Sequence, residues 1–243
     1  MKKEQFYLIG GRHAVIESVN NPKRTIKTIY VNSEKNLSII ESVNKKKAEV
    51  LLKSKEQFDK LFKDKSFSHQ GFAAEIHALN YQELNDFLKD GMTNKQKRIF
   101  VILDNVQDDR NIGSIIRSSY GLGACGIIIN NREFRKTSIN MHKAASGAIE
   151  YLPIFQVSNI LNSIHLLKKN SYWIYSMDSN SKDSIFFEKF GNNLAFIFGS
   201  EFEGIKNIVL KNSDKKLKIP MKSNIGSLNI SNAVAATLAI VQK

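Results

Sequence analysis

The chain of 243 residues contains little cysteine and little proline, with one cysteine and three prolines. A single cysteine excludes an intramolecular disulfide framework and a zinc site built from clustered cysteines, and it fits a reducing, cytosolic location. No segment approaches the ~18 apolar residues that a membrane-spanning helix needs; the longest candidate is Ala233–Val241. The apolar stretch near the amino terminus is also too short for a secretory signal, so we expect no export.

Acidic residues are scarce relative to basic ones. Lys and Arg number 36 against 23 Asp and Glu, which gives a formal net charge of +13. The surplus is shared along the chain, because residues 1–97 contain 18 basic and 12 acidic side chains and residues 98–243 contain 18 and 11. A positive field of this kind concentrates polyanions, so nucleic acid is the leading candidate partner. The 42% of hydrophobic residues is typical of a globular chain and excludes a disordered or collagen-like one.

The sequence divides into two regions, residues 1–80 and 98–243, joined by a charged linker at 81–97. In the first region short β-like and helix-like segments alternate, which predicts one small α/β unit. Its expected strands are residues 26–31, 49–52 and 72–79, and its expected helices are residues 37–44 and 55–63.

The second region has more continuous apolar runs, which are typical of parallel strands covered on both faces. The expected strands are residues 99–103, 126–129, 152–155, 172–177, 194–198 and 217–220, and the expected helices are residues 111–122, 159–169, 204–211 and 229–241. This alternation predicts a doubly wound α/β domain with a mainly parallel sheet.

A G-x-G-x-x-G string at Gly121–Gly126 suggests a dinucleotide site, but its position argues against one. That fingerprint must follow a strand and open a helix, so that a phosphate meets the helix N-terminus. Here it ends an expected helix and precedes an expected strand. We therefore interpret these glycines as a helix C-cap and tight turn.

Three polar segments follow buried strands, at the position where parallel α/β domains bind ligands. The first contains Asn111, which could cap the next helix, and Arg117, whose fixed charge needs either a salt-bridge partner or an anion. The second is the loop Gly199–Gly204, whose Glu201 and Glu203 could be acids at a helix N-terminus. The third, residues 219–233, contains Ser227 and Asn229, either of which could cap the final helix.

In order and spacing, these three segments resemble the three signature motifs of the SpoU family of the SPOUT superfamily, the TrmH and RlmB type of RNA ribose methyltransferases. Residues 10–15 and 69–72 resemble marks of the family's N-terminal substrate-binding domain, so the resemblance covers the whole chain. It implies a parallel-sheet α/β (SPOUT) catalytic domain with a C-terminal deep trefoil knot, and a smaller, ribosomal-protein-like α/β domain before it. The two-domain layout favours the RlmB-like branch.

The resemblance also implies an activity: transfer of a methyl group from S-adenosyl-L-methionine to a ribose 2′-hydroxyl, by a homodimer. Carried over by position, the catalytic residues are Asn111, Arg117, Glu201, Ser227 and Asn229, and the cofactor-binding residues are Gly199, Ile219 and Leu228. Because a guanidinium stays protonated, we expect Arg117 to bind an RNA phosphate and stabilise developing oxyanion charge. Asn111 and Glu201 would position Arg117 and the loops, and Ser227 and Asn229 would fix the third loop.

The expected substrate is a guanosine ribose of 23S ribosomal RNA. The alternatives are tRNA, as in TrmH-like enzymes, and a non-catalytic RNA-binding protein with this fold. Candidate backbone-contacting residues are the run Lys45–Lys47, which is more simply a solvated face, and the group Arg132, Arg135 and Lys136. We expect no metal site, structural roles for His13 and His69, and an inert thiol at Cys125.

Overall fold

The computed structural model describes residues 6–79, 81–89, 97–222 and 226–242. The chain forms two compact units: unit 1 is Met1–Asn80 with Arg135–Tyr151, and unit 2 is Tyr81–Phe134 with Leu152–Lys243. The first segment of unit 1 ends at residue 80. Residues 135–151, which the sequence placed in the second region, group with the first. Part of the expected linker at 81–97 lies outside the described residues, and helix α4 (Leu84–Lys89) forms within the described part.

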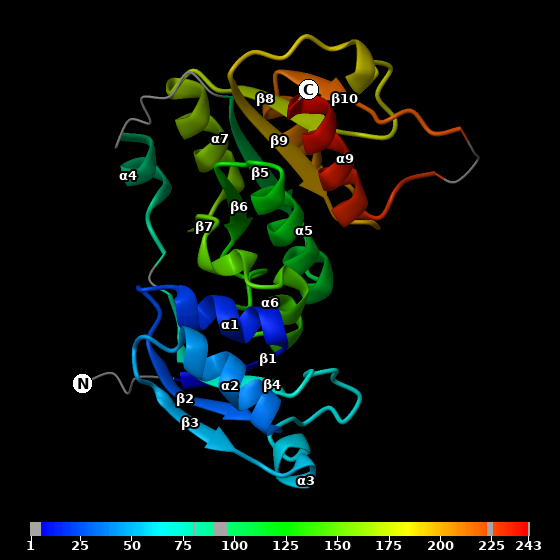
Figure 1. The fold of residues 1–243 in the computed structure, drawn as a ribbon. Helices are drawn as coiled ribbons and strands as arrows, with labels where there is room; N and C mark the ends of the chain where they lie inside the picture. The colour runs from blue at the N-terminus through cyan, green and yellow to red at the C-terminus, as the bar shows by residue number, and fades with distance from the viewer. Residues whose placement is uncertain (1–5, 80, 90–96, 223–225, 243) are drawn as a thin grey trace. The chain divides into compact units, whose positions relative to one another are not determined.

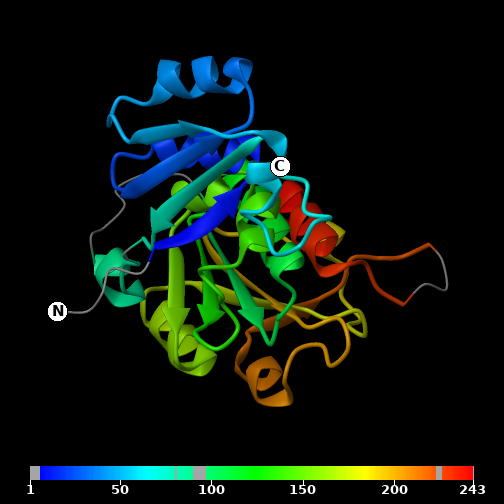
Figure 2. The ribbon, with the colours of Figure 1, turned by 90° about the horizontal axis from the view of Figure 1, so that it is seen from below.

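Unit 1 is built on a mixed four-stranded sheet with the order β1-β4-β2-β3 (Figure 2). Strand β4 pairs antiparallel with β1 and β2, and β2 pairs parallel with β3. The bounds are β1 Phe6–Gly10, α1 Arg12–Asn20, β2 Ile26–Val31, α2 Glu34–Val43, β3 Glu49–Leu52, α3 Lys55–Asp59, β4 Phe72–His77, α6 Ile139–Ala145 and η1 Ala148–Glu150. The expected strands 26–31 and 49–52 agree with β2 and β3, whereas β1, α1 and α6 were not expected.

A buried ion pair explains why residues 135–151 belong to unit 1. Glu150 at the end of η1 accepts hydrogen bonds from Arg24, with the shortest N–O distance 2.6 Å and both side chains buried. Ser18 and Asn21 donate to the same carboxylate. Burial alone would raise the pKa of Glu150, but Arg24 and the other donors outweigh it and hold the pKa below its ordinary value. Because a buried charge without its partner is costly, the pair fixes this segment to α1 and the loop after it.

Unit 2 contains, in its described residues, a parallel six-stranded sheet with the order β10-β8-β9-β5-β6-β7 (Figure 1). The bounds of its remaining elements are β5 Arg98–Asp104, α5 Asp109–Gly121, β6 Gly126–Asn130, β7 Ile154–Val157, α7 Ile160–Lys169, β8 Trp173–Met177, η2 Ile185–Phe187, β9 Asn193–Gly199, α8 Asn207–Asn212, β10 Lys215–Leu217 and α9 Ile230–Gln242. All six expected strands are present, so the prediction of a doubly wound parallel sheet is confirmed.

Helices cover both faces of the six-stranded sheet. On one face, residues such as Phe100 and Ile102 of β5 pack with α4, α7 and α8. Side chains alternate along a strand, so Val101 and Leu103 point to the other face. There α5 and α9 lie side by side, as both ribbon views show (Figures 1 and 2). The last helix of the chain is therefore packed beside the helix that follows the central strand.

The glycine string at 121–126 forms the turn that its position predicted. Helix α5 ends at Gly121, and Gly123 adopts a φ of 72°, a left-handed conformation that favours glycine. The chain then enters β6 at Gly126. The rejection of a dinucleotide site here agrees with the structure. Within the part of the chain that the structure describes, no helix combines the length and apolar character that crossing a membrane requires.

Candidate functional site

The three polar segments meet at the carboxyl edge of the six-stranded sheet. Strands β5 and β9 are parallel neighbours, ending in register at Asp104 and Gly199. From β5 the chain moves to β6 on one side, whereas β9 and β8 lie on the other, so the strand order reverses at β5. Open α/β sheets bind ligands at this kind of reversal, outside the carboxyl ends of the strands. The strand order therefore indicates that a ligand would bind at the loops after β5 and β9.

The start of α5 differs from the expected one. Asp108 is the N-cap, and its Oδ1 accepts a hydrogen bond from the backbone nitrogen of Asn111 at 2.8 Å. Asn111 therefore lies inside the first turn, and the capping role considered for it is wrong. Its side chain instead extends to the loop after β9.

Asn111, Glu201 and Asn229 form a closed hydrogen-bonded group, here called the amide–carboxylate triad. Glu201 Oε1 accepts from Asn111 Nδ2 at 3.1 Å and from Asn229 Nδ2 at 2.7 Å. Asn229 Nδ2 also contacts Asn111 Oδ1 at 3.1 Å. Each member comes from a different polar segment, separated from the others by 28 to 118 residues along the chain. The triad therefore ties the three segments together.

Asn229 also caps the last helix. Its Oδ1 accepts from the backbone nitrogen and the hydroxyl of Ser231, at 2.9 and 2.6 Å, at the start of α9. The side-chain oxygen of Asn229 therefore caps α9, and its side-chain nitrogen donates to Glu201 in the triad. The expectation that Asn229 could cap this helix is confirmed, and this role accompanies the contact with Glu201.

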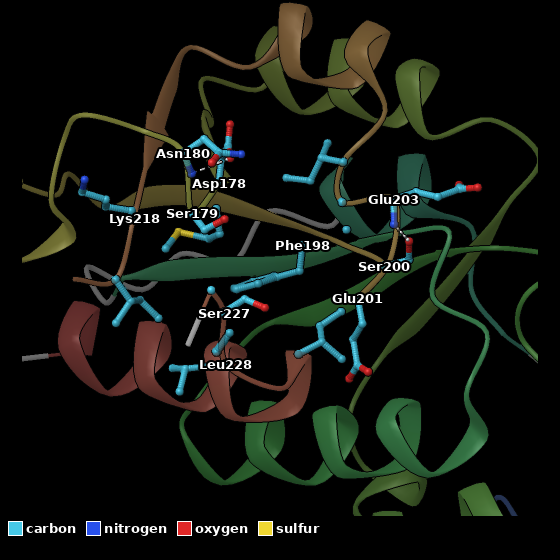
Figure 3. A pocket seen from close by; sticks show the side chains of 18 of the residues that line it. Asp178, Ser179, Asn180, Phe198, Ser200, Glu201, Glu203, Lys218, Ser227 and Leu228 are labelled. Atoms are coloured by element: carbon cyan, nitrogen blue, oxygen red, sulfur yellow. Dashed lines mark hydrogen bonds between the residues drawn. The ribbon is translucent and has the colours of Figure 1, made fainter. Parts of the chain in front are cut away.

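A cavity of about 450 Å³ lies beside the triad, between the loops after β8, β9 and β10 and the start of α9. Its lining includes five of the predicted site residues: Gly199, Glu201, Ile219, Ser227 and Leu228. Figure 3 shows Phe198 in the middle of the lining, Leu228 and Ser227 near the start of α9, and Asp178, Ser179 and Asn180 at the other end. The cavity thus combines an apolar middle with polar groups at its ends.

The turn from Ser200 to Gly204 forms one wall of this cavity. The backbone nitrogen of Gly204 donates to the carbonyl of Ser200 at 3.0 Å, and that of Glu203 donates to Ser200 Oγ at 3.1 Å. A Cβ at Gly199 would collide with the main chain of Gly204 and Ile205, so only glycine permits this close return. Glycine at this position is therefore required by the backbone itself.

A second cavity of about 380 Å³ adjoins the same turn. It is lined by the loop after β5, by Asn111, and by residues Ser200 to Glu203. Glu201 and Phe202 line both cavities, so the turn separates them. Glu203 accepts from Asn105 Nδ2 at 2.8 Å, which joins the turn to the loop after β5.

Arg117, also predicted to be catalytic, lies on a different face of α5 from Asn111. It is exposed on α5 and lines neither cavity. Six residues of α-helix place it about 9 Å along the axis from Asn111 and about 120° around it. The spacing that linked the two residues in the sequence therefore separates their side chains in space.

The structure also shows residues that sequence reasoning missed. Asp104 is buried at the end of β5, and its carboxylate accepts from the backbone nitrogen of Lys206 at 2.9 Å. It thereby fixes the end of the loop after β9, and an acidic residue ending an apolar strand was the available signal. Helix α8 begins at Asn207, so Glu201 and Glu203 are not acids in its first turn.

The structure bears on several residues outside this site. His69 contacts Asp59 at 3.0 Å and stacks on Phe62, so its ring is packed within unit 1. Burial raises the pKa of the Cys125 thiol, in agreement with low reactivity. In the run Lys45–Lys47, Lys46 Nζ donates to the backbone carbonyls of Asn21 and Arg24, so this lysine has a structural contact.

No three His, Cys, Asp or Glu side chains among the described residues come together in a way that could hold a metal ion.

Comparison with known proteins gives two family matches. Residues 98–239 match the SpoU rRNA Methylase family, and residues 8–82 match the family described as RNA 2′-O ribose methyltransferase substrate binding. The Bacillus subtilis protein YacO, named as a TrmH family tRNA/rRNA methyltransferase, is 30% identical over 100% of this chain and 96% of its own. A Staphylococcus aureus protein named for the same family is 31% identical over 97% of this chain and 94% of its own.

Solved structures share the fold. AviRb of Streptomyces viridochromogenes, a SpoU methyltransferase in complex with AdoMet, has a TM-score of 0.80 at 19% identity, over 98% of this chain and 89% of its own. The AdoMet-bound rRNA methyltransferase of Sinorhizobium meliloti has a TM-score of 0.77 at 19% identity, over 98% and 87%. The TrmH/SpoU tRNA modifying enzyme of A. aeolicus has a TM-score of 0.55 at 23% identity, over 65% and 80%.

Proposed function

The chain belongs to the SpoU rRNA Methylase family, and we propose that it transfers a methyl group from S-adenosylmethionine to a ribose 2′-hydroxyl of RNA. One observation carries the proposal: the amide–carboxylate triad joins three distant segments beside a cavity that contains Gly199, Ile219 and Leu228. Those three were the residues expected to hold the cofactor. Family membership indicates the methyl-transfer reaction, and the cavity is where we place S-adenosylmethionine.

The residues around the larger cavity fit S-adenosylmethionine. A volume of about 450 Å³ lies within the usual range of roughly 300–1,000 Å³ for small-molecule sites. Phe198, Leu217 and Leu228 offer apolar surface for an adenine ring, and the carboxylates of Asp178 and Glu201 favour the cofactor's cationic groups. When bound, the cofactor supplies a methyl group on a positively charged sulfur, which is already electrophilic.

The protein must then align a weakly acidic sugar hydroxyl and stabilise the negative charge that develops on it. Asn111 and Asn229 hold the Glu201 carboxylate in place, and we assign these three a positioning role together with Ser227. Arg117, which stays protonated, would bind the neighbouring RNA phosphate and stabilise the developing oxyanion. Its side chain is exposed on α5.

We propose that the substrate is a guanosine ribose in 23S ribosomal RNA. The two-domain layout supports this choice, because residues 8–82 match a substrate-binding family. The neighbouring fold named as an rRNA methyltransferase extends over 98% of this chain, compared with 65% for the one named as a tRNA modifying enzyme. A tRNA ribose is the alternative, since the curated relatives are named for both RNAs.

The resemblance also leads us to propose a homodimer, a trefoil-knotted C-terminal segment and a cytoplasmic location. Arg117 supports the homodimer: it lies on a different face of α5 from Asn111, so a second copy of the chain could bring it to a site. Mixing Arg117→Lys with Glu201→Gln would test such sharing. If subunits exchange, a shared site restores part of the activity that each variant lacks, and separate sites restore none.

The experiment that tests the function incubates the protein and labelled S-adenosylmethionine separately with unmodified ribosomal RNA and unmodified tRNA. Label in large-subunit RNA is the expected result, and label in tRNA alone would favour the alternative substrate. Cofactor binding without label in either RNA, or in a precursor ribosomal particle, would favour a non-catalytic RNA-binding protein. The Glu201→Gln variant, assayed in parallel, shows whether the label depends on the triad.

A further inference from the structure

Phe202 is the most exposed large apolar side chain of the described residues, at 99%. It occupies the middle of the Ser200–Gly204 turn, which the hydrogen bonds from Gly204 and Glu203 to Ser200 close. An aromatic ring left in water forgoes the favourable free energy of burial. Because Phe202 borders both cavities, its ring is a candidate contact for a molecule bound there.

The neighbours of Phe202 fix the direction in which it is displayed. Glu201 is bound to Asn111 and Asn229, and Glu203 is bound to Asn105. Both flanking side chains are thus anchored to other segments of the site, on different sides of the turn (Figure 3). The main chain at Gly199 lies close to that at Gly204, and this close packing limits movement of the turn that carries Phe202. Phe202 is held outward on a supported backbone.

The position of Phe202 relates it to the proposed reaction. It lines both cavities, whereas the other highly exposed phenylalanine, Phe187 in η2, is 90% exposed and lines neither. The turn lines the larger cavity, so a nucleotide whose ribose binds there would lie near Phe202. Proteins read unpaired RNA largely by stacking its bases on aromatic rings, and such stacking tolerates different bases because every base has a π-face.

We propose that Phe202 is a stacking platform for an unpaired RNA base, and that it positions the nucleotide being methylated or its neighbour over the cavity. The inference rests on the proposed function, which makes RNA the molecule that reaches this edge. It adds to that function a specific contact outside the triad and the predicted cofactor residues. The role requires a ring, so a leucine of similar bulk cannot replace it.

Steady-state methylation of the RNA that the wild type modifies tests this role. We expect Phe202→Ala and Phe202→Leu to lose roughly 5- to 140-fold in kcat/KM, mostly through KM for RNA. This range corresponds to about 1–3 kcal/mol per stacked base at 1.4 kcal/mol per tenfold change. Phe202→Trp and Phe202→Tyr should keep most of the activity, and the affinity for S-adenosylmethionine should be unchanged in all four. Phe187→Ala, the matched control, should behave as the wild type.

A binding measurement separates failure of this inference from failure of the proposed function. The chain's one tryptophan, Trp173, is replaced by Phe so that Phe202→Trp reports alone. The fluorescence of the tryptophan introduced at position 202 should be quenched by single-stranded oligoadenylate and by an unmodified ribosomal RNA transcript, even if no methyl transfer occurs. Absence of quenching, or wild-type RNA affinity in Phe202→Ala, would overturn the proposal. It would also be overturned if Phe202→Ala altered the sedimentation of the protein, because the ring would then be a contact between copies of the chain.

Discussion

The side-chain nitrogen of Asn229 lies 2.7 Å from Oε1 of Glu201, so the residue before the last helix is bound to the loop after β9. The oxygen of the same amide accepts from Ser231 and caps α9. The helix that packs beside α5 is therefore positioned by the group that also positions the carboxylate. Substitutions of Asn229 can test the capping of α9 separately from the hydrogen bond to Glu201.

Replacing Asn229 by Ser or by Asp keeps an oxygen that can cap α9 but removes the amide donor to Glu201. Asp also adds a like charge beside that carboxylate. We expect near wild-type melting temperatures and a fall in turnover of roughly 10- to 100-fold, the effect of about 1.5–3 kcal/mol for a hydrogen bond to a charged group. The fall in turnover should be larger for Asn229→Asp than for Asn229→Ser. Wild-type turnover and wild-type stability in both variants would mean that Asn229 acts only as a helix cap.

Gly199→Ala tests whether the turn after β9 forms the cofactor cavity. The added Cβ would collide with the main chain at Gly204 and Ile205, so the turn must shift. We expect a cost of about 1–3 kcal/mol in the free energy of unfolding and roughly a tenfold or greater loss of S-adenosylmethionine affinity. Gly191→Ala is the matched control, because nothing lies within 4 Å of a Cβ there. Calorimetric titration that gives normal affinity for Gly199→Ala would place the cofactor elsewhere.

Much of this fold could be predicted because the positions of its strands follow from local hydrophobic patterns in the sequence. Expected strands 26–31 and 49–52 correspond to β2 and β3, and the six apolar runs of the second region all form strands. Strand β10 ends at Leu217 and not at residue 220, and α8 starts at Asn207 and not at 204. Such boundaries depend on caps and loop contacts, such as that of Asp104 with Lys206, which periodicity does not report.

The remaining differences come from long-range contacts. The buried pair Arg24 and Glu150 is separated by 126 residues, and no local pattern links a basic residue after α1 to an acidic one in η1. It explains why residues 135–151 join unit 1. At the site, motif order brought Asn111, Glu201 and Asn229 together correctly. The six-residue spacing within the expected helix 111–122 already implied that Arg117 lies on another face from Asn111, and the resemblance grouped the two only by their positions along the chain.

The pH dependence of stability should depend on His142, which is fully buried in unit 1. Burial is the main cause that lowers its pKa, from the ordinary 6.5 to about 4. Between these values the unfolded chain binds a proton that the folded chain does not, so stability falls as the pH decreases. From pH 7 to pH 5 the loss should be about 2 kcal/mol. Glu150, with its lowered pKa, adds a loss at still lower pH.

Urea unfolding at pH 7 and pH 5 measures this effect. His142→Gln removes the titrating group while keeping a donor for the carbonyl of Lys136, which His142 Nε2 contacts at 3.0 Å. The variant should lose about 2 kcal/mol less than the wild type over this interval. His13→Gln, at an exposed position, is the control and should follow the wild type. An unchanged slope in His142→Gln would contradict the assignment.

Arg117→Lys keeps the charge but loses the planar guanidinium that binds phosphate in two places. We expect turnover to fall roughly 100-fold or more, as when an oxyanion-stabilising donor is removed. Cofactor affinity should stay near normal, because Arg117 lines neither cavity. Arg110→Lys, also exposed on α5, should have a much smaller effect. Single-turnover rates with saturating cofactor would show this, and an unchanged rate would refute the role of Arg117.

The most direct test of the central claim is the position of the transferred methyl group. RNA labelled by the protein from S-adenosylmethionine is hydrolysed with alkali, which cleaves after every nucleotide that has a free 2′-hydroxyl. Our account predicts that the label remains in an alkali-resistant dinucleotide, and that Glu201→Gln and Arg117→Lys reduce this product. Label recovered in mononucleotides would place the methyl group on a base and would contradict ribose 2′-O-methylation by this site.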